Sequence, residues 1–243
     1  MYVDITWYVE GLKEFKADAY IVVDVLRFST TVAAALSIGF SKIYVFSDIG
    51  KAIEFSRKIK ALLLAEVEGV KPISADLDNS PTELMNWVSR YGVGSGELVI
   101  RTTSGALIVD EALKLGLNNV FIGSIANAKY VARAIKELNV NTVNIVCAGY
   151  RRTKFSLEDF LGGGAIILEL SKLTSVELGD EAIAASHLFD SIITKNKLID
   201  VVKLGRHGSF LWKTGRSKDV EFACSFNSLN VIPKLINGAI VRL

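Results

Sequence analysis

Short apolar runs alternate with helix-length amphipathic segments through the first 150 residues of the chain, and this alternation is what most limits its fold. The apolar runs cover residues 19–26, 42–46, 61–67, 98–102, 120–123 and 143–147. The helix-length segments between them cover residues 30–38, 49–60, 82–89, 105–115 and 126–138. Continuous apolar strands separated by helices are typical of a mainly parallel sheet covered by helices on both faces. The sequence therefore predicts a three-layer α/β/α fold, in which right-handed crossovers would bring every strand's carboxyl end to one edge of the sheet.

The pattern changes after residue 147. A helix is predicted from Leu157, with Ser156 as its N-cap, and the glycines at 162–164 predict close packing of this helix against another backbone. A second helix is predicted over residues 180–195, and strands over 220–223 and 239–243. Because no Pro- or Ser-rich linker divides the chain, we treat residues 1–243 as a single unit. The change of pattern leaves open a second, smaller α/β lobe on the C-terminal side, with lobes 1–140 and 141–243.

Composition limits the class of protein. Half of the 243 residues are hydrophobic, which predicts a substantial buried core, and 28 basic residues balance 26 acidic ones without a basic stripe, so no nucleic-acid partner is expected. No apolar stretch reaches the roughly 18 residues of a membrane helix, and the start of the chain lacks the basic segment of a signal peptide. Two cysteines without CxxC spacing fit a reducing cytoplasm. Assembly into a homo-oligomer is left open.

The first apolar run leads into DVLRFSTT, residues 24–31, which places an acid, an arginine and hydroxyls where a strand ends and a helix begins. Ligands of parallel α/β sheets bind outside the carboxyl ends of strands, against the free N–H groups of the next helix. Arg27 offers a fork of donors that matches a phosphate, with Ser29 and Thr30 beside it, and Asp24 suits a hard metal such as Mg²⁺. A plain N-cap at Ser29 with a surface ion pair is the structural alternative.

Three further strand ends carry similar groups. Glu66 lies at the end of the run at 61–67, and Asp76 follows it. The run at 98–102 ends in Thr102 and is followed by Thr103 and Ser104, and the run at 143–147 is followed by Arg151, Arg152, Glu158 and Asp159. Hydroxyls and free N–H groups at a helix start cradle an anion, although acids in a first helical turn also simply complement the helix dipole. The residues Ser80 and Pro81 that follow Asp76 are interpreted as helix-capping residues.

Carboxylates beside an anion-binding site predict metal-assisted phosphate chemistry. We expect five acids to converge on one divalent cation: Asp24, Glu66, Asp76, Glu158 and Asp159. Oxygen ligands point to Mg²⁺ rather than zinc, and the two histidines lack HxxxH spacing. The predicted chemistry is phosphoryl transfer or phosphate-ester hydrolysis on a small anionic phosphorylated metabolite. The predicted catalytic residues are Asp24, Arg27, Glu66 and Asp76, and the predicted anion-binding residues are Arg27, Ser29, Thr30, Thr102, Thr103, Ser104, Arg151 and Arg152.

Other enzyme classes fail on spacing. The chain has no GxxxxGK[ST] and no GxSxG, and the glycines at 92, 94 and 96 precede an apolar run instead of following one. Cys147 has no CxxxxxR phosphate loop and is expected to be a buried structural cysteine.

Taken together, these motifs resemble the 2-phosphosulfolactate phosphatase family, the Mg²⁺-dependent enzymes linked to coenzyme M biosynthesis. The motifs are VVDVLRFSTT at 22–31, AEVEG at 65–69, DLDNSP at 76–81, TTSG at 102–105, IGSIANA at 122–128 and VCAGYRRTKFSLEDFLGGGAI at 146–166, with weaker matches in GRHG at 205–208 and the segment 219–235. The resemblance implies hydrolysis of (2R)-phospho-3-sulfolactate to sulfolactate and phosphate. It also adds Asn127 to the expected substrate-binding residues.

The chain departs from the family's usual motifs at four positions. Val67 and Glu68 stand where Arg and Gly are usual, Asp78 replaces a glycine, and Ser104 replaces an asparagine. If these side chains face the pocket, they predict a weaker preference for the sulfonated substrate than for a less charged phosphorylated hydroxy acid. If they point to solvent, specificity is unchanged.

Two hypotheses follow. In the first, the chain is a Mg²⁺-dependent phosphomonoester hydrolase that acts on a small phosphorylated hydroxy acid such as 2-phosphosulfolactate. In the second, it is a non-catalytic binding or sensor module that uses the same anion cradle for a phosphorylated metabolite.

Overall fold

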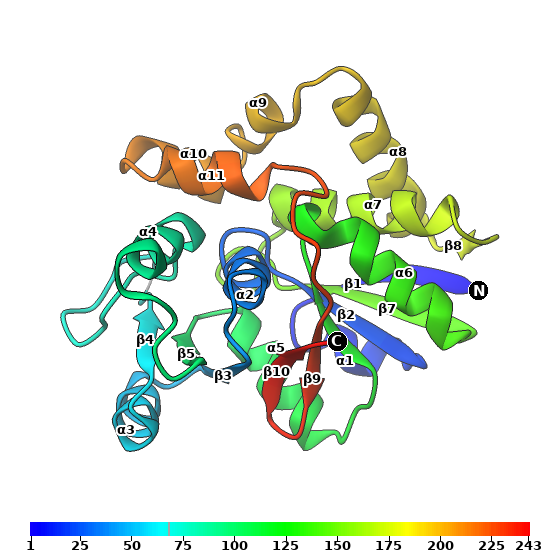
Figure 1. Cartoon of the computed structure of the whole chain (residues 1–243). Helices are drawn as coiled ribbons and strands as arrows, with labels where there is room; N and C mark the ends of the chain where they lie inside the picture. Colours follow the sequence, from blue (N-terminus) through cyan, green and yellow to red (C-terminus); the bar gives the residue numbers. More distant parts are fainter. Residues whose placement is uncertain (68) are drawn as a thin grey trace.

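A computed structural model of the chain describes residues 1–67 and 69–243 and confirms the α/β fold (Figure 1). The described strands are β1 (Tyr2–Trp7), β2 (Ala19–Val23), β3 (Lys42–Phe46), β4 (Leu62–Ala65), β5 (Glu97–Arg101), β6 (Val120–Gly123), β7 (Thr142–Cys147), β8 (Glu177–Leu178), β9 (Pro233–Ile236) and β10 (Ala239–Arg242). The described helices are α1 (Gly11–Glu14), α2 (Phe28–Ser37), α3 (Ile49–Ile59), α4 (Pro81–Tyr91), α5 (Gly105–Lys114), η1 (Ile125–Asn127), α6 (Ala128–Leu138), α7 (Leu157–Ser171), α8 (Asp180–Thr194), α9 (Leu198–Val202), α10 (Arg206–Lys213) and α11 (Ser217–Ala223).

The strands form one sheet in the order β4-β5-β3-β10-β9-β6-β2-β7-β1-β8. Strands β4, β5 and β3 make one parallel block, and β6, β2, β7, β1 and β8 make a second. The hairpin β9–β10 joins the blocks through antiparallel pairs with β3 and β6. Across these reversals the two blocks run in opposite directions, so the expected single edge of carboxyl ends is not formed. The carboxyl ends of both blocks still meet, because the residues after β2 and β7 line the same cavity as those after β4 and β5.

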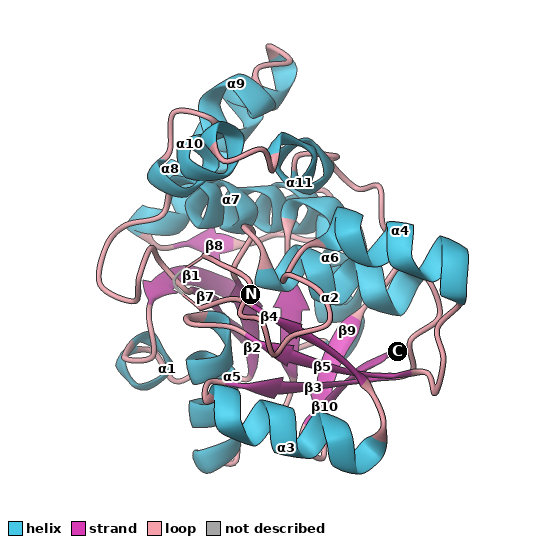
Figure 2. Ribbon diagram, turned by 90° about the vertical axis from the view of Figure 1, so that its left-hand side faces the viewer, coloured by secondary structure: helices cyan, strands magenta, loops and turns pink. Residues whose placement is uncertain are grey.

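Strand β2 lies at the centre of the fold, buried along its whole length. Successive side chains of a strand point to opposite faces. Ile21 and Val23 pack with α6, α7 and α8, whereas Tyr20 and Val22 pack with α2 and α5. A separate cluster lies between α3 and the strands β4 and β5, and Figure 2 shows α3 below these strands. Both faces of the sheet are therefore covered, as the continuous apolar runs predict.

Helix α7 begins where the sequence predicts, and the Ser156 side chain accepts the Asp159 N–H as an N-cap. Its glycines allow the expected close approach: a Cβ at Gly164 would meet the Ala185 backbone of α8, and one at Gly162 would meet side chains of the β2 region. The predicted helix over 180–195 is confirmed as α8, and the predicted strand over 239–243 as β10.

The predicted strand over residues 220–223 is wrong, because these residues belong to α11. Val220 and Ala223 are buried three positions apart, which is helical spacing. A run of four residues is too short for its periodicity to separate a strand from a buried helical turn.

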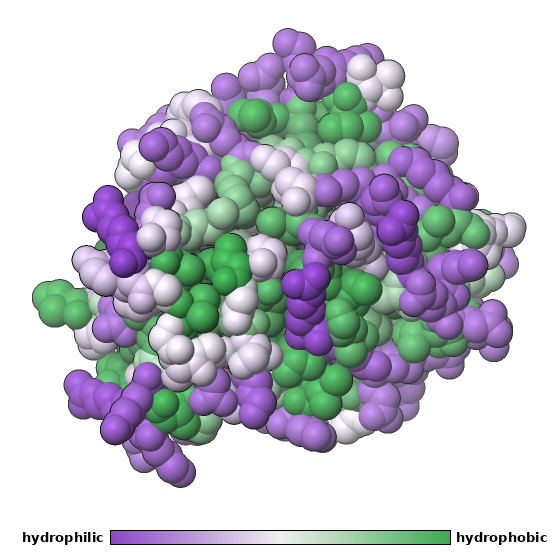
Figure 3. Space-filling view, in the orientation of Figure 1, coloured by the Kyte–Doolittle hydropathy of each residue, from purple (hydrophilic) through white to green (hydrophobic). Residues whose placement is uncertain are grey.

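Both sides of residue 140 contribute to the one sheet, since β7 lies between β2 and β1. The last helices gather on one side, where α8 packs on α7 and α11 packs on α4 (Figures 1 and 2). Hydrophilic side chains make up most of the molecule's outline in Figure 3, and hydrophobic side chains lie nearer the centre of that face.

Among the described residues, no helix combines the length and the apolar character needed to span a membrane.

Candidate active site

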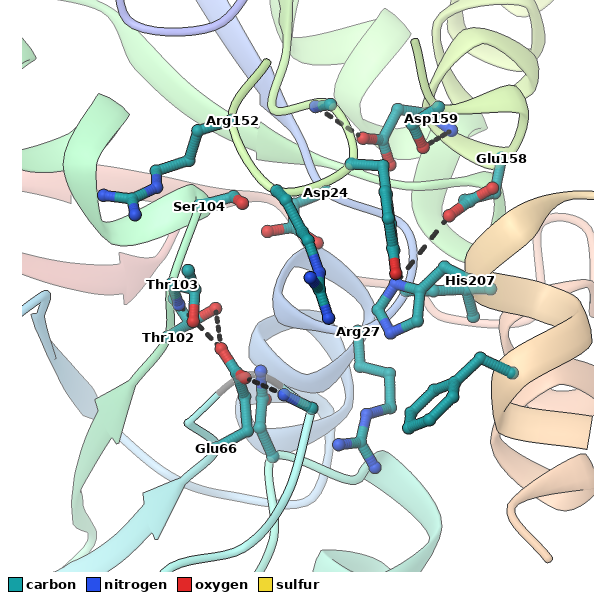
Figure 4. A pocket seen from close by; sticks show the side chains of 18 residues that line it. Asp24, Arg27, Glu66, Thr102, Thr103, Ser104, Arg152, Glu158, Asp159 and His207 are labelled. Carbon is teal, nitrogen blue, oxygen red and sulfur yellow. Dashed lines mark hydrogen bonds and ion pairs between the residues drawn. The ribbon is translucent and has the colours of Figure 1, made fainter. Parts of the chain in front are cut away.

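A cavity with ≈ 940 Å³ of empty space, including its open mouth, lies where the strands of both blocks end (Figure 4). Its wall comes from the segments after β2, β4, β5 and β7, from the start of α7 and from α10. The lining residues are Asp24, Leu26, Arg27, Glu66, Gly69, Asn79, Thr102, Thr103, Ser104, Gly149, Tyr150, Arg151, Arg152, Ser156, Glu158, Asp159, His207 and Phe210.

The structure brings most of the predicted site residues together in this cavity. Those in the wall are Asp24, Arg27, Glu66, Thr102, Thr103, Ser104, Arg151, Arg152, Glu158 and Asp159. Four others do not line it: Ser29, Thr30, Asp76 and Asn127. The expectation that strand-end groups converge therefore describes the geometry of the cavity well.

Each of the four remaining residues has a visible contact elsewhere. The Asp76 carboxylate accepts the N–H of Leu63 (2.8 Å) near the start of β4, so it lies at the opposite end of that strand from Glu66. Asn127 is fully buried and closes the turn before α6: its Oδ1 accepts the N–H and hydroxyl of Ser124. Ser29 and Thr30 are buried and bond to the backbone of the β2–α2 turn, where Ser29 Oγ accepts the Asp24 N–H (2.9 Å).

Asp24 lies at the back of the cavity with almost no exposure. One oxygen accepts the N–H of Gly105 (3.1 Å) at the start of α5. Burial raises the pKa of Asp24 to about 7, and the negative charges of Glu66 and Glu158 add to the rise. Asp24 is therefore a carboxyl group that carries uncompensated negative charge when it ionises.

Glu66 joins two loops of the wall. Its Oε1 accepts the N–H of Thr103 (2.7 Å) and the hydroxyl of Thr102 (3.3 Å), and its Oε2 accepts the N–H of Gly69 (2.7 Å). Arg101 donates to the Glu66 carbonyl oxygen and lies 3.9 Å from Oε1. These bonds fix the Glu66 carboxylate opposite the other acids.

Two buried acids at the start of α7 complete the acidic wall. Asp159 accepts the N–H groups of Val25 (2.8 Å) and Gly149 (3.0 Å), so it ties the β2–α2 turn to the end of β7. Burial raises the pKa of Asp159, as do the charges of Asp24 and Glu158, and burial likewise raises the pKa of Glu158. Both carboxyls hold a proton more readily than exposed ones.

Arg27 lies in the wall with its guanidinium already paired. It makes a two-bond ion pair with Asp78 (2.9 Å for each bond), and its Nη1 also donates to Asp219 (3.0 Å) of α11. Arg216 pairs with the same Asp78 through Nε (2.9 Å). The Asp219 carboxylate also accepts the Ser80 hydroxyl (2.7 Å) at the start of α4, so this network joins α4, α11 and the β2–α2 turn.

This network removes the main reason to expect a changed specificity. Asp78 is buried and faces two arginines instead of projecting a free charge into the cavity. Val67 is exposed and does not line the cavity, whereas Ser104 does. Glu68 lies outside the described residues.

Arg151 and Arg152 follow β7 in a tight turn and are exposed. Both have positive φ values, 50° and 67°, which non-glycine residues adopt at an energetic penalty. The Arg151 guanidinium lies over the Tyr150 ring, 5.6 Å from its centre. In Figure 4, Arg152 lies on the same side of the cavity as Ser104.

His207 is the main wall residue that sequence reasoning missed. Its Nδ1 lies 3.8 Å from Glu158 Oε1, and burial lowers the His207 pKa to about 4, with a further contribution from the positive charge of Arg27. The imidazole is therefore neutral at ordinary pH. The GRHG motif was the available signal, but nothing in sequence places a helix so far along the chain beside the strand ends. Phe210 of the same helix was missed for the same reason, whereas Tyr150 and Asn79 lie inside motifs that the sequence already singles out but carry no charge that marks them as site residues.

The donor set of the wall fits a lightly coordinated Mg²⁺. Among the described residues, no three His, Cys, Asp or Glu side chains are grouped so as to hold a metal ion by themselves, so the expected convergence of five acids on one cation is wrong. Mg²⁺ does not require such a group, since it commonly takes one or two carboxylates together with water and substrate phosphate. Asp24 and Glu66 offer these oxygens, and their mutual repulsion is what a cation would relieve.

Comparison with known proteins shows the family to which the chain belongs. The family model for 2-phosphosulpholactate phosphatase matches residues 8–238. A protein of Carboxydothermus hydrogenoformans named as a probable 2-phosphosulfolactate phosphatase is 35% identical over 96% of this chain and 93% of its own length. The 2-phosphosulfolactate phosphatase of Methanocaldococcus jannaschii is 32% identical over 87% of this chain and 86% of its own length. The chain belongs to the 2-phosphosulfolactate phosphatase family.

Proposed function

We propose that the chain is a Mg²⁺-dependent phosphomonoester hydrolase that converts 2-phosphosulfolactate to sulfolactate and phosphate. The observation that carries the proposal is the meeting of buried acids and exposed arginines in one cavity of a chain that matches the family from residue 8 to 238. The substrate comes from the printed names of the relatives. Acids beside an anion-binding wall are what metal-assisted hydrolysis of a phosphate ester requires.

The anion is held by three groups of donors. Arg151 and Arg152 bring two exposed positive charges to the mouth, and the hydroxyls of Thr103 and Ser104 stand at the start of α5. Arg27 uses three of its N–H bonds on Asp78 and Asp219, which leaves two of the five that a guanidinium carries. We assign these two to the phosphate, with the carboxylates fixing the direction of the fork.

Asp24 and Glu66 would hold the cation. When bound, Mg²⁺ neutralises phosphate charge and lowers the pKa of a bound water. Glu66 is fixed by the N–H groups of Thr103 and Gly69, so its carboxylate needs no rearrangement to act as a ligand. Asp24 is fixed in the same way by Gly105.

His207 and Glu158 form the proton-transfer pair in this proposal. The departing hydroxy acid needs a proton on its ester oxygen, and we assign its supply to the Glu158 carboxyl, whose pKa is raised by burial. His207 Nδ1 lies 3.8 Å from Glu158 Oε1. The imidazole can pass a proton to the ester oxygen while it receives one from Glu158, so it returns to its neutral form.

The proposed specificity favours the sulfonated substrate. Asp78 is neutralised by Arg27 and Arg216, so it adds no net negative charge to the cavity. The two exposed arginines suit a ligand that carries sulfonate and carboxylate groups besides its phosphate. We therefore expect a higher kcat/KM for 2-phosphosulfolactate than for 2-phospholactate.

Phosphate release from 2-phosphosulfolactate tests the proposal. We expect activity with Mg²⁺ or Mn²⁺, its loss in EDTA and its return when metal is restored. Asp24→Asn should be inactive, and Asp190→Asn, an exposed change on α8, should behave as the wild type. Full activity in EDTA would remove the metal from the proposal. Tight binding of the phosphoester without phosphate release under any metal condition would favour the binding module instead.

A further inference from the structure

Asn79 lines the cavity and carries a buried side-chain oxygen that has no hydrogen-bond partner. The residue is 1% exposed and lines the cavity wall between β4 and α4. Its Oδ1 is a buried side-chain oxygen with no hydrogen-bond partner, and it is the only such side-chain atom among residues 1–67 and 69–243. Burying an acceptor without a donor destabilises a protein, and such an atom calls for an explanation.

The surrounding contacts hold the backbone on both sides of Asn79. The Asn79 backbone N–H donates to Asp78 Oδ1 (2.9 Å), and Asp78 is itself held by Arg27 and Arg216. On the other side, Ser80 caps α4 and donates to Asp219. The residues before and after Asn79 are therefore anchored by buried ion pairs and a helix cap, which keep the Asn79 backbone beside the cavity.

Asn127 shows what a structural asparagine looks like in the same protein. It is also fully buried, but its Oδ1 accepts two hydrogen bonds from Ser124 and its Nδ2 donates to the carbonyl oxygens of Ile122 and Val231. Asn127 stabilises the fold through these bonds. Asn79 has no comparable set of side-chain partners in the described residues.

We propose that Asn79 is a ligand-binding residue of the active site, whose Oδ1 accepts a hydrogen bond from an O–H group that arrives with the phosphorylated substrate. Two O–H donors fit this acceptor: a hydroxyl on the phosphoryl group itself, or a water held by the bound cation. The inference deepens the proposed hydrolase function and rests on it. This acceptor has no partner in the free protein and is closed off from solvent, so it gains its bond only when binding brings the donor and the Asn79 side chain together.

The test compares Asn79→Leu with Asn127→Leu. Leucine is close to asparagine in shape and has no polar atoms. For Asn79→Leu we expect a melting temperature equal to or above that of the wild type, because an unpaired buried acceptor is removed. We also expect inorganic phosphate to bind roughly five- to tenfold more weakly, as for the loss of one hydrogen bond. For Asn127→Leu we expect a lower melting temperature and, in the folded protein, unchanged phosphate affinity.

Calorimetric titration of inorganic phosphate into each full-length variant, once in EDTA and once in Mg²⁺, separates the two donors. Weaker binding in both conditions assigns the contact to the phosphate hydroxyl, and weaker binding only in Mg²⁺ assigns it to metal-bound water. Wild-type affinity of Asn79→Leu in both conditions overturns the inference, and so does a lower melting temperature with unchanged affinity. If Asn79→Leu does not fold, Asn79→Ala is measured in the same way. Failure of the wild-type protein to bind phosphate at all would instead contradict the proposed function.

Discussion

Burial of the Asp24 carboxyl predicts that this residue lowers the free energy of unfolding of the protein at neutral pH. The Asp24 pKa is raised from 3.8 to about 7 because the carboxyl is buried near Glu66 and Glu158. Between these pH values the folded protein keeps a proton that the unfolded chain has released. The folded state then binds more protons than the unfolded one, so this group lowers the free energy of unfolding as the pH rises from about 4 to 7.

The size of the effect follows from the pKa shift. A shift of roughly 3 units at 1.36 kcal/mol per unit gives an upper value of about 4 kcal/mol. Because the neighbouring acids titrate together with Asp24, we expect about 2–4 kcal/mol. Asp24→Asn removes this charge and can keep the bond from Gly105, so the variant should be more stable than the wild type at pH 7.5 by that amount. For a chain of this length the gain corresponds to a rise in Tm of roughly 5–15 °C.

The assay is thermal or denaturant unfolding of both proteins in EDTA at pH 7.5 and pH 5. His207 acts in the opposite direction, because its lowered pKa makes stability rise with pH between about 4 and 6.5. The difference between wild type and Asp24→Asn cancels that contribution. We expect this difference to fall by about half from pH 7.5 to pH 5, as Asp24 takes up its proton.

A control substitution and the effect of Mg²⁺ test whether the buried charge of Asp24 lowers stability. Asp190→Asn is exposed on α8 and should leave stability unchanged at both pH values. Addition of Mg²⁺ should stabilise the wild type more than Asp24→Asn, because the cation binds a site that includes Asp24. The reasoning is refuted if Asp24→Asn is less stable than the wild type in EDTA at pH 7.5, or if the difference between the two proteins does not change with pH.

Three further substitutions test other parts of the site. Asp76→Asn should keep kcat/KM within about twofold of wild type and lower the free energy of unfolding by about 1 kcal/mol, because it weakens one bond to Leu63 outside the cavity. A large loss of kcat with normal stability would show that Asp76 belongs to the site. Arg27→Lys should lower activity, and it should lower stability by roughly 3 kcal/mol in denaturant unfolding. Two buried carboxylates lose a guanidinium that lysine cannot replace. Wild-type stability of the variant would contradict the buried ion pairs. His207→Gln should slow hydrolysis of 2-phosphosulfolactate about 100-fold. Hydrolysis of an aryl phosphate with a good leaving group should slow much less, because its leaving oxygen needs no proton. Equal losses on both substrates would rule out proton transfer to the leaving oxygen.

The sequence could predict the central strands because burial on both faces leaves an unmistakable pattern. The apolar runs at 42–46 and 120–123 coincide with β3 and β6. Helix starts were predictable where a cap is present, as at Ser156 and Ser80, whose side chains accept N–H bonds three residues on. These signals are local, so they survive in a single sequence.

The arrangement of the strands was not predictable in the same way. A hairpin of the last residues, β9–β10, enters the middle of the sheet and reverses the direction of one parallel block. Strand pairing of this kind depends on contacts between residues far apart in the chain, for which periodicity gives no signal. The short helix α11 was mistaken for a strand because one buried turn and one buried strand have the same composition.

The site residues differ in the same way: some are marked by local sequence signals, and others reach the cavity only through long-range packing. Asp24 and Arg151 could be expected at one site because they follow the parallel neighbours β2 and β7, whereas Glu66 follows a strand of the other block and reaches the cavity only through the arrangement of the whole sheet. Asp76 could not be excluded, since only the pairing of its segment with Leu63 shows that it lies at the far end of β4. His207 could not be included, because α10 reaches the cavity only through the packing of the last helices.

The Arg27 network explains why those last helices matter to the chemistry. Asp219 of α11 and Arg216 just before it bind the same buried ion pairs that fix Arg27 and Asp78. Removing one partner from such a network leaves an unpaired buried charge, so the network holds α11 against α4 and the β2–α2 turn as one unit. His207 on the neighbouring helix α10 is thereby kept beside Glu158. The anion-binding arginine and the proton-transfer histidine of the proposed mechanism thus depend on the same set of contacts. The acid at position 78 stabilises the site because it forms ion pairs with both Arg27 and Arg216.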